Sequence, residues 1–114
     1  RTLYAKEDAL LIRIRKTLAA RNIDWQVGAE EGRLLQWLIR LHGTKRVVEI
    51  GTLGGYAAIW MARALPEDGQ LITIEKNPEH ARMAQGFIAE SDVAGRITVR
   101  EGDAHAILKD LALT

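Results

Sequence analysis

Residues 48–56 read VEIGTLGGY, and this stretch decides the fold class. Its first residues belong to a short run rich in β-branched side chains, whereas a helical pattern begins at about Tyr56. Three glycines, Gly51, Gly54 and Gly55, lie between the two patterns. Glycine lets the backbone turn sharply and lets a ligand approach without a Cβ in the way. A doubly wound sheet binds its ligand at such a strand-to-helix turn, so the stretch predicts a strand, a ligand-binding turn and a helix.

The spacing of these glycines differs from that of two common phosphate-binding motifs. A dinucleotide-binding G-x-G-x-x-G that began at Gly51 would need glycine at positions 53 and 56, where Leu53 and Tyr56 stand. A phosphate-binding loop needs a lysine after its glycines, and none follows these. A nicotinamide-dependent oxidoreductase stays open as an alternative because of the strand-helix-strand order and the acidic Glu75, but the glycine spacing argues against it.

The rest of the chain repeats the alternation of strand and helix patterns. Strands are predicted at 47–50, 71–75 and 97–100, and helices at about 56–65, at about 78–91 and from Ala104 onward. Asn77 followed by Pro78 is typical of a helix start. Alternation with short connections requires parallel strands and right-handed crossovers. We therefore expect an α/β, Rossmann-like, doubly wound fold over residues 44–114.

Residues 1–43 are predicted to form two leading helices of the same domain. On the first, apolar side chains recur at helical spacing: Leu3, Leu10, Leu11, Ile14 and Leu18. The second is expected over 29–42, with a C-terminal cap at Gly43. Its predicted apolar side consists of Leu34, Leu35, Trp37, Leu38 and Leu41. We expect this side to be buried, and Trp37 and Trp60 to be core residues.

The composition is that of a single soluble globular domain. The chain has 114 residues, 47% hydrophobic and 27% charged, which is ordinary for one domain. No segment approaches the roughly 20 consecutive apolar residues that span a bilayer. The net charge of +1 gives no general attraction to nucleic acid, and the absence of cysteine suits a reducing cytoplasm. We expect a cytoplasmic protein that binds neither nucleic acid nor membranes.

Positive charge gathers near the start of the chain. Residues 1–22 hold six Lys or Arg against two Asp or Glu. A solvated helix face is the simpler interpretation. A basic helix that faces a partner or gates a substrate is the alternative.

Acidic residues stand where the second and third predicted strands end. Glu75 ends the second strand, where a carboxylate can accept hydrogen bonds from both hydroxyls of a ribose. Asp103 and Ala104 follow the third strand, and an acidic side chain with a small neighbour suits an adenine ring. Asp103 could equally cap the last helix. With the glycine turn, these residues outline a pocket for an adenosine-like ligand without a pyrophosphate, and S-adenosylmethionine fits that description.

Other polar residues have two possible interpretations. Glu49 could meet a ligand or could pair with Lys45 or Arg46, and a carboxylate at the end of a parallel strand favours the ligand. His80 and His105 are expected to be ordinary helix residues, since no histidine and carboxylate spacing indicates a metal site.

Two stretches resemble a known family. Residues 47–85, VVEIGTLGGYAAIWMARALPEDGQLITIEKNPEHARMAQ, and 97–108, ITVREGDAHAIL, are similar to the S-adenosylmethionine-dependent O-methyltransferases of the catechol and caffeoyl-CoA type. The resemblance covers about residues 20–110. It implies transfer of the methyl group of S-adenosylmethionine to a hydroxyl of a small, catechol-like acceptor, assisted by Mg²⁺ or another divalent cation.

The resemblance also implies a cofactor-binding role for the residues that match. These are Glu49, Gly51 and Thr52 for the methionine part, Leu53, Gly55 and Tyr56 for the shape of the loop, Glu75 for the ribose, Asp103 and Ala104 for the adenine, and Val27 for closure over the cofactor. One departure is Ala57, where the family commonly has a serine that contacts the cofactor carboxylate.

The family's sheet has seven strands in the order 3-2-1-4-5-7-6, and its metal-binding catalytic centre lies on the strand that would follow Thr114. We therefore expect this chain to be the N-terminal half of such a domain, with no catalytic or metal residue of its own and no activity alone. Its first strand would present an open apolar edge, which favours pairing with another chain and a homodimer. A non-catalytic cofactor-binding fragment is the second alternative.

Overall fold

The computed structural model describes residues 7–21 and 28–112. Three parallel strands form a sheet in the order β1-β2-β3: β1 (Arg46–Ile50), β2 (Gln70–Glu75) and β3 (Ile97–Glu101). The predicted α/β class is confirmed, and each predicted strand agrees to within one residue at either end. The register places Glu49 opposite Thr73, so their side chains lie on the same face of the sheet.

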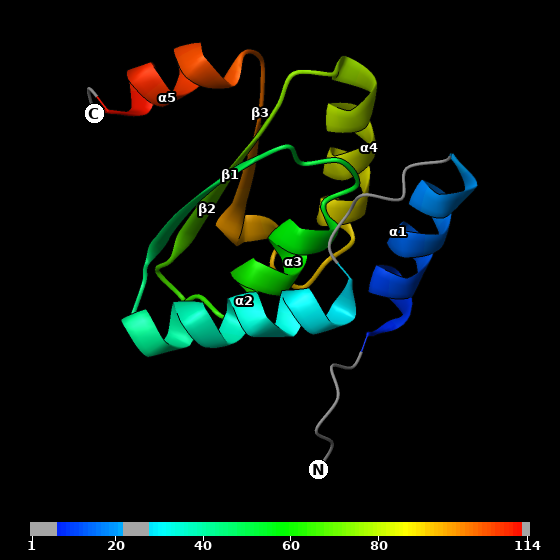
Figure 1. The fold of residues 1–114 in the computed structure, drawn as a ribbon, viewed down its shortest axis with the longest axis horizontal. Helices are drawn as coiled ribbons and strands as arrows, with labels where there is room; N and C mark the ends of the chain where they lie inside the picture. The colour runs from blue at the N-terminus through cyan, green and yellow to red at the C-terminus, as the bar shows by residue number, and fades with distance from the viewer. Residues whose placement is uncertain (1–6, 22–27, 113–114) are drawn as a thin grey trace.

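In the described residues five helices accompany the sheet: α1 (Ala9–Ala20), α2 (Ala29–His42), α3 (Tyr56–Ala62), α4 (Pro78–Ala89) and α5 (Ala104–Ala112), with a 3₁₀ turn at Ala94–Arg96. Figure 1 shows α3 and α4 on one side of the strands, with α1 and α2 outside them, and α5 on the other side. The expected caps are present, since Gly43 has a φ of 62° and the Asn77 side chain accepts from the first amides of α4. Of the helices described, none is long and apolar enough to cross a membrane.

The main core lies between the sheet and helices α1, α3 and α4. Leu11, Ile14 and Leu18 of α1 are fully buried, as their spacing predicts, whereas Leu3 lies outside the described residues. Burial of each such side chain contributes about 1.5–3 kcal/mol. Trp60 of α3 is buried as expected. These contacts fix α1 directly beside the loop that joins β1 to α3.

The basic face of α1 pairs with acidic side chains of α4. Arg13 forms an ion pair with Glu90, the C-terminal cap of α4, and Arg21, the C-terminal cap of α1, forms one with Glu79. The exposed fraction of each of the four side chains is about one half or more. Exposed pairs of this kind contribute less than about 1 kcal/mol each. The pairs agree with the interpretation of this face as a solvated one.

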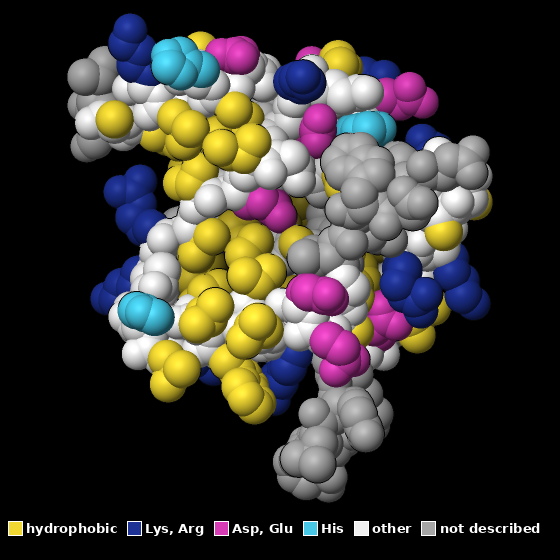
Figure 2. Space-filling view, in the orientation of Figure 1, with side chains coloured by type: hydrophobic (Ala, Val, Ile, Leu, Met, Phe, Trp, Pro, Cys, Tyr) yellow, Lys and Arg dark blue, Asp and Glu magenta, His cyan; other side chains and the backbone are white. Residues whose placement is uncertain are grey.

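Strand β1 is an edge of the described sheet, because β2 is the neighbour with which it pairs there. Its outward side chains Val48 and Ile50 are 47% and 62% exposed. Figure 2 shows an apolar area on this face of the molecule, between the positions of α2 and α5 in Figure 1. The expected order of the first three strands and the open apolar edge are both confirmed for the described residues.

The prediction for the buried side of α2 was wrong. Its apolar side chains are exposed: Leu34 56%, Trp37 55%, Leu38 44% and Leu41 81%, with Leu35 alone of that set half-buried. The side that meets α3 carries Gly32, Gln36 and Ile39 instead.

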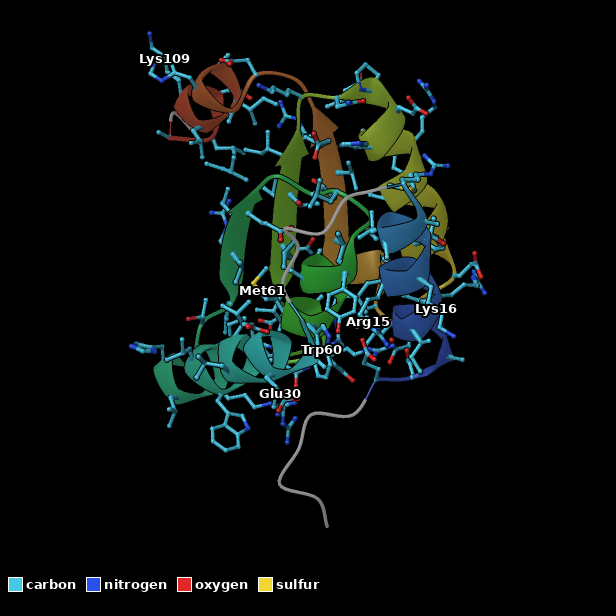
Figure 3. The ribbon with its side chains drawn as sticks, turned by 45° about the vertical axis from the view of Figure 1, so that its right-hand side comes forward. Arg15, Lys16, Glu30, Trp60, Met61 and Lys109 are labelled. Carbon is cyan, nitrogen blue, oxygen red and sulfur yellow. The ribbon has the colours of Figure 1, made fainter. Side chains whose placement is uncertain are left out.

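Two contacts with Trp60 explain this orientation of α2, and Figure 3 shows Trp60 where α3 meets α2. A Cβ on Gly32 would lie 2.6 Å from the indole ring, so glycine is what allows the two helices to approach. Gln36 Nε2 donates to the Trp60 carbonyl oxygen at 2.6 Å. A close approach at a glycine and a buried hydrogen bond therefore determine the side that α2 presents to α3.

Candidate functional site

Two adjoining hollows lie at the carboxyl ends of the strands. The β1 hollow, about 420 Å³, is lined by Leu18, Leu35, Val48, Glu49, Ile50, Gly51, Thr52, Leu53, Tyr56, Ala57 and Met61. The β2–β3 hollow, about 450 Å³, is lined by Ile50, Gly51, Leu53, Ile74, Glu75, Lys76, Asn77, His80, Gly102, Asp103 and Ala104. The two share Ile50, Gly51 and Leu53, so an elongated ligand could occupy both by crossing the backbone at Gly51. In Figure 3, Met61 lies between β1 and α2, on the side of the β1 hollow.

The three glycines of the loop between β1 and α3 have different structural roles. Gly51 has a φ of 87°, and a Cβ there would meet nothing within 4 Å, so its backbone is open to a ligand. Gly54 instead packs against α1, where a Cβ would lie 2.9 Å from the Ile14 side chain. Gly55, at a φ of 84°, faces Ile88 of α4 in the same way. Of the three, Gly51 is therefore the one whose missing side chain makes room for a ligand.

Glu75 holds the loop in shape and also lines the β2–β3 hollow. Its side chain is buried, with Oε1 accepting from the Leu53 amide at 3.0 Å and Oε2 accepting from the Asn77 amide at 3.1 Å. The first bond stabilises Leu53 at a φ of 51°, an uncommon conformation for a residue with a Cβ. Each carboxylate oxygen keeps a second lone pair. Glu75 can therefore accept further hydrogen bonds from ligand hydroxyls in the hollow.

Glu49 occupies a different electrostatic environment in the β1 hollow. Its Oε1 accepts from the Thr73 hydroxyl at 2.6 Å. Burial raises the pKa of Glu49 to about 7, the charge of Glu75 acts in the same direction, and the hydrogen bond from Thr73 opposes both. Within the described residues Glu49 forms no ion pair with Lys45 or Arg46, and Lys45 pairs with Asp68. The salt-bridge interpretation of Glu49 was therefore wrong, and the carboxylate faces the hollow without a cation beside it.

Thr73 is a site residue that was not predicted from the sequence. It is fully buried in β2, and its hydroxyl lies 2.6 Å from the Thr52 hydroxyl as well as 2.6 Å from Glu49. The alternation of side chains along β2 is the signal that could have revealed it, because Thr73 stands two residues before Glu75 and on the same face.

Tyr56 connects the loop to the start of the chain. Its buried hydroxyl donates to Glu7 Oε2 at 2.6 Å, and Glu7 accepts two further bonds from Arg15 of α1. Burial and the bond to Glu7 raise the pKa of Tyr56, whereas the bond from Arg15 lowers that of Glu7. The phenol is therefore a neutral donor that anchors α1 beside the β1 hollow. Glu7 and Arg15 were not foreseen, because they lie far from Tyr56 in sequence.

Asp103 both lines the β2–β3 hollow and caps α5. Its Oδ2 accepts from the Ala106 amide at 2.9 Å, which confirms the capping interpretation. Ala104 lines the same hollow beside it. Ala57 lines the β1 hollow, and Val27 lies outside the described residues. The structure thus places the described candidates around the two hollows, with Gly55 beneath them against α4.

Histidines and acids do not gather into a metal centre in the described part of the chain, where no three such side chains lie close enough to hold an ion. His80 Nδ1 is 3.9 Å from Glu75 Oε2, too far for a hydrogen bond.

Comparison with known proteins places this arrangement in a family. A family model described as O-methyltransferase matches residues 2–113. The chain belongs to the O-methyltransferase family. A catechol O-methyltransferase of Niastella koreensis is 41% identical over 106 residues, which cover 93% of this chain and 48% of that protein. Caffeoyl-CoA O-methyltransferase 1 of Zea mays is 34% identical over 113 residues, covering 96% and 43%.

Solved structures of O-methyltransferases share the fold. TomG from Streptomyces achromogenes, solved in complex with SAM, has a TM-score of 0.89 and 42% identity, covering 96% of this chain and 49% of that one. The Bacillus cereus O-methyltransferase, solved in complex with SAH, has a TM-score of 0.87 and 34% identity, covering 96% and 50%. This chain spans about half the length of the O-methyltransferases it matches. The matches favour the Rossmann-like methyltransferase over the nicotinamide-dependent oxidoreductase.

Proposed function

We propose that this chain forms the cofactor-binding half of an S-adenosylmethionine-dependent O-methyltransferase. One observation carries the proposal: Glu49 and Glu75, at the ends of neighbouring parallel strands, line two hollows that meet at the open backbone of Gly51. A ligand with hydroxyls at one end and a positive charge at the other matches these two carboxylates. The relatives solved with SAM or SAH support the choice of that ligand.

Each candidate residue would contact a particular part of the cofactor. Glu75 would accept from the ribose hydroxyls through its remaining lone pairs, and Asp103 and Ala104 would border the adenine. Glu49, Gly51 and Thr52 would hold the methionine part. The loop's shape would depend on Leu53, Gly55 and Tyr56, and Val27 would close over the cofactor.

The bound cofactor supplies a methyl group on a positively charged sulfur, and the chain's own residues bind and orient it. Catalysis of such a displacement depends largely on holding the reacting groups in line. We assign no catalytic base to the described residues. The names of the relatives support a catechol-like hydroxyl as the acceptor that we propose. Metal assistance would need ligands other than the described residues. The cytoplasmic location that we propose rests on the cysteine-free composition. The homodimer that we propose for these 114 residues alone rests on the exposed apolar edge of β1.

The test is calorimetric titration of the full-length protein with S-adenosylhomocysteine and, separately, with NAD. We expect S-adenosylhomocysteine to bind and NAD not to bind. Gly51→Val should abolish binding, because its side chain would enter the space that joins the hollows and would be strained at a φ of 87°. Gly43→Val is the matched control, since Gly43 also has a positive φ, 62°, and open space where a Cβ would lie, but is away from both hollows.

Two results would contradict the proposal. Binding of NAD alone would favour the oxidoreductase, and equal binding by Gly51→Val would place the cofactor elsewhere. Methylation of a catechol, assayed with and without Mg²⁺, then tests the acceptor separately. Cofactor binding without transfer to any catechol would overturn the acceptor and leave the cofactor site standing.

A further inference from the structure

We propose that Thr73, buried in β2, is a positioning residue that makes the β1 hollow selective for the ammonium group of an amino-acid ligand. It would act by fixing the Glu49 carboxylate and the Thr52 hydroxyl at the same time. The inference rests on the proposed function, because the ligand considered is the amino-acid end of S-adenosylmethionine or S-adenosylhomocysteine.

The three side chains form one continuous hydrogen-bonded chain. Thr73 Oγ1 lies 2.6 Å from Glu49 Oε1 and 2.6 Å from Thr52 Oγ1. The register of the strands produces the first contact, because Glu49 and Thr73 are direct neighbours across β1 and β2. The second contact crosses from β2 to the glycine loop. Thr73 is thus the shared member between a strand-end acid and a loop hydroxyl.

The direction of the hydrogen bonds follows from counting protons. A threonine hydroxyl has a single proton to donate. When Glu49 is ionised it can only accept, so Thr73 gives its proton to Glu49 and must accept from Thr52. The Thr52 hydroxyl proton is then donated to Thr73 and cannot be donated to a ligand. The Thr52 oxygen keeps a lone pair that can accept a hydrogen bond from a ligand in the hollow.

This polarity favours a ligand group that only donates. Glu49 and Thr52 both line the β1 hollow, and in this arrangement both offer acceptors. An ammonium group has three donors and no acceptor, so it is complementary to such a pair. A ligand carboxylate in the same place would be disfavoured, because Glu49 and Thr52 would both present acceptors to it and neither would donate. Glu49 also has no cationic partner among the described residues, so a ligand cation would supply the missing charge.

Packing alone does not account for a threonine at this position. Thr73 is fully buried, and valine would fill nearly the same volume with equal preference for a strand. A hydroxyl in the interior is unfavourable unless it is hydrogen-bonded. Here both of its bonds lead to residues that line the hollow, rather than to the backbone.

The experiment compares Thr73→Val with Thr73→Ser in the full-length protein at pH 8, where Glu49 is ionised. Calorimetry measures the Kd of three ligands: S-adenosylhomocysteine, its analogue that lacks only the amino group, and methylthioadenosine, which lacks the whole amino-acid end. Thr73→Val should weaken S-adenosylhomocysteine about tenfold and should change the other two less than twofold. Thr73→Ser, which keeps the hydroxyl, should restore affinity to within about threefold.

The outcomes separate the inference from the proposed function. Failure of the unmodified protein to bind S-adenosylhomocysteine would overturn both. Normal affinity in Thr73→Val, or an equal loss for all three ligands, would overturn the role of Thr73 and leave the proposed function intact. If Thr73→Val does not fold by circular dichroism, Thr73→Ala, which also removes the hydroxyl, provides the same test. Thr73→Ala should lose affinity for S-adenosylhomocysteine and not for the analogue without the amino group, and an equal loss for both would contradict the inference.

Discussion

The β1 hollow and the β2–β3 hollow each contain a glutamate at a strand end, but the two carboxylates are held in different ways. Backbone amides of Leu53 and Asn77 fix Glu75, whereas a side-chain hydroxyl, that of Thr73, fixes Glu49. Glu49 has a pKa raised to about 7 by burial. The comparison shows that position at a strand end does not by itself define a carboxylate's chemistry. The hydrogen-bond donors around each carboxylate decide its role. Glu75 stabilises the loop, whereas Glu49 is available to bind a ligand cation.

The largest difference between the hollows should appear when each carboxylate is removed. Glu75→Ala deletes the acceptor for two loop amides as well as for the ligand. Hydrogen bonds to a charged group contribute about 1.5–3 kcal/mol each, so affinity for S-adenosylhomocysteine should fall about 100-fold or more and the melting temperature should drop. Calorimetry and thermal unfolding measure the two effects.

Glu101→Ala is the matched control for that change, because Glu101 is the cross-strand neighbour of Glu75 and is exposed. It should alter neither quantity appreciably. If Glu75→Ala kept full affinity, the assignment of the β2–β3 hollow to the ribose would be wrong.

The contribution of Glu49 should instead appear in the pH dependence of ligand affinity. Ionised Glu49 pairs with the ligand's ammonium group, so affinity for S-adenosylhomocysteine should rise about tenfold between pH 6 and pH 8 as Glu49 ionises through its pKa of about 7. Glu49→Gln should bind more weakly at pH 8 and should show a flat profile. The ligand analogue without the amino group is the control. A profile that stayed steep in Glu49→Gln would assign the titration to a group other than Glu49.

The raised pKa of Glu49 also predicts that the stability of the ligand-free protein falls as pH rises, whereas the affinity for the ligand increases. A carboxyl whose pKa is higher in the folded state stabilises the fold while protonated, and this contribution is lost as pH rises from about 4.5 through about 7. Without ligand, Glu49→Gln should therefore gain stability relative to the unmodified protein over that range, by up to roughly 3 kcal/mol at pH 8. Denaturant unfolding at pH 5 and pH 8 measures the difference. An equal difference at both values would contradict the raised pKa.

A smaller effect is expected for Tyr56, which lines the β1 hollow and not the β2–β3 hollow. Tyr56→Phe removes the hydrogen bond to Glu7, which anchors α1 beside the β1 hollow. We expect a loss of about 1–2 kcal/mol in the free energy of unfolding, with little change in the Kd of methylthioadenosine, which would occupy mainly the β2–β3 hollow. Equal losses of affinity for that ligand and for S-adenosylhomocysteine would mean that the two hollows are not independent.

The smallest effect concerns Asp103, which has a capping role in addition to its place in the β2–β3 hollow. Asp103→Ala should cost about 1 kcal/mol of stability through loss of the cap, whereas Asp103→Asn, which keeps an acceptor, should stay within about 0.5 kcal/mol. Affinity for methylthioadenosine should fall severalfold in the alanine variant and recover in the asparagine one. Unchanged affinity in both would restrict Asp103 to the cap.

The candidate site was largely predictable because its signals are local. A β-branched run followed by Gly51 identifies the turn, and an acid at the end of each of two strands points to the same edge of a parallel sheet. The network behind the site was not predictable in this way. Thr73 reaches Glu49 through the strand register, and Glu7 reaches Tyr56 across 49 residues.

The contrast is clearest in α2. The sequence by itself determined that residues 29–42 form a helix ending at Gly43, because helix periodicity and a left-handed cap are properties of neighbouring residues. It also determined the three strands and the glycine turn. Which side of α2 faces α3 was decided only by the tertiary structure. The leucines favour burial anywhere, but Gly32 has no Cβ and so lets α2 approach Trp60 closely, and Gln36 adds a buried hydrogen bond on the same side. Such steric fit between distant segments exists only once the chain has folded.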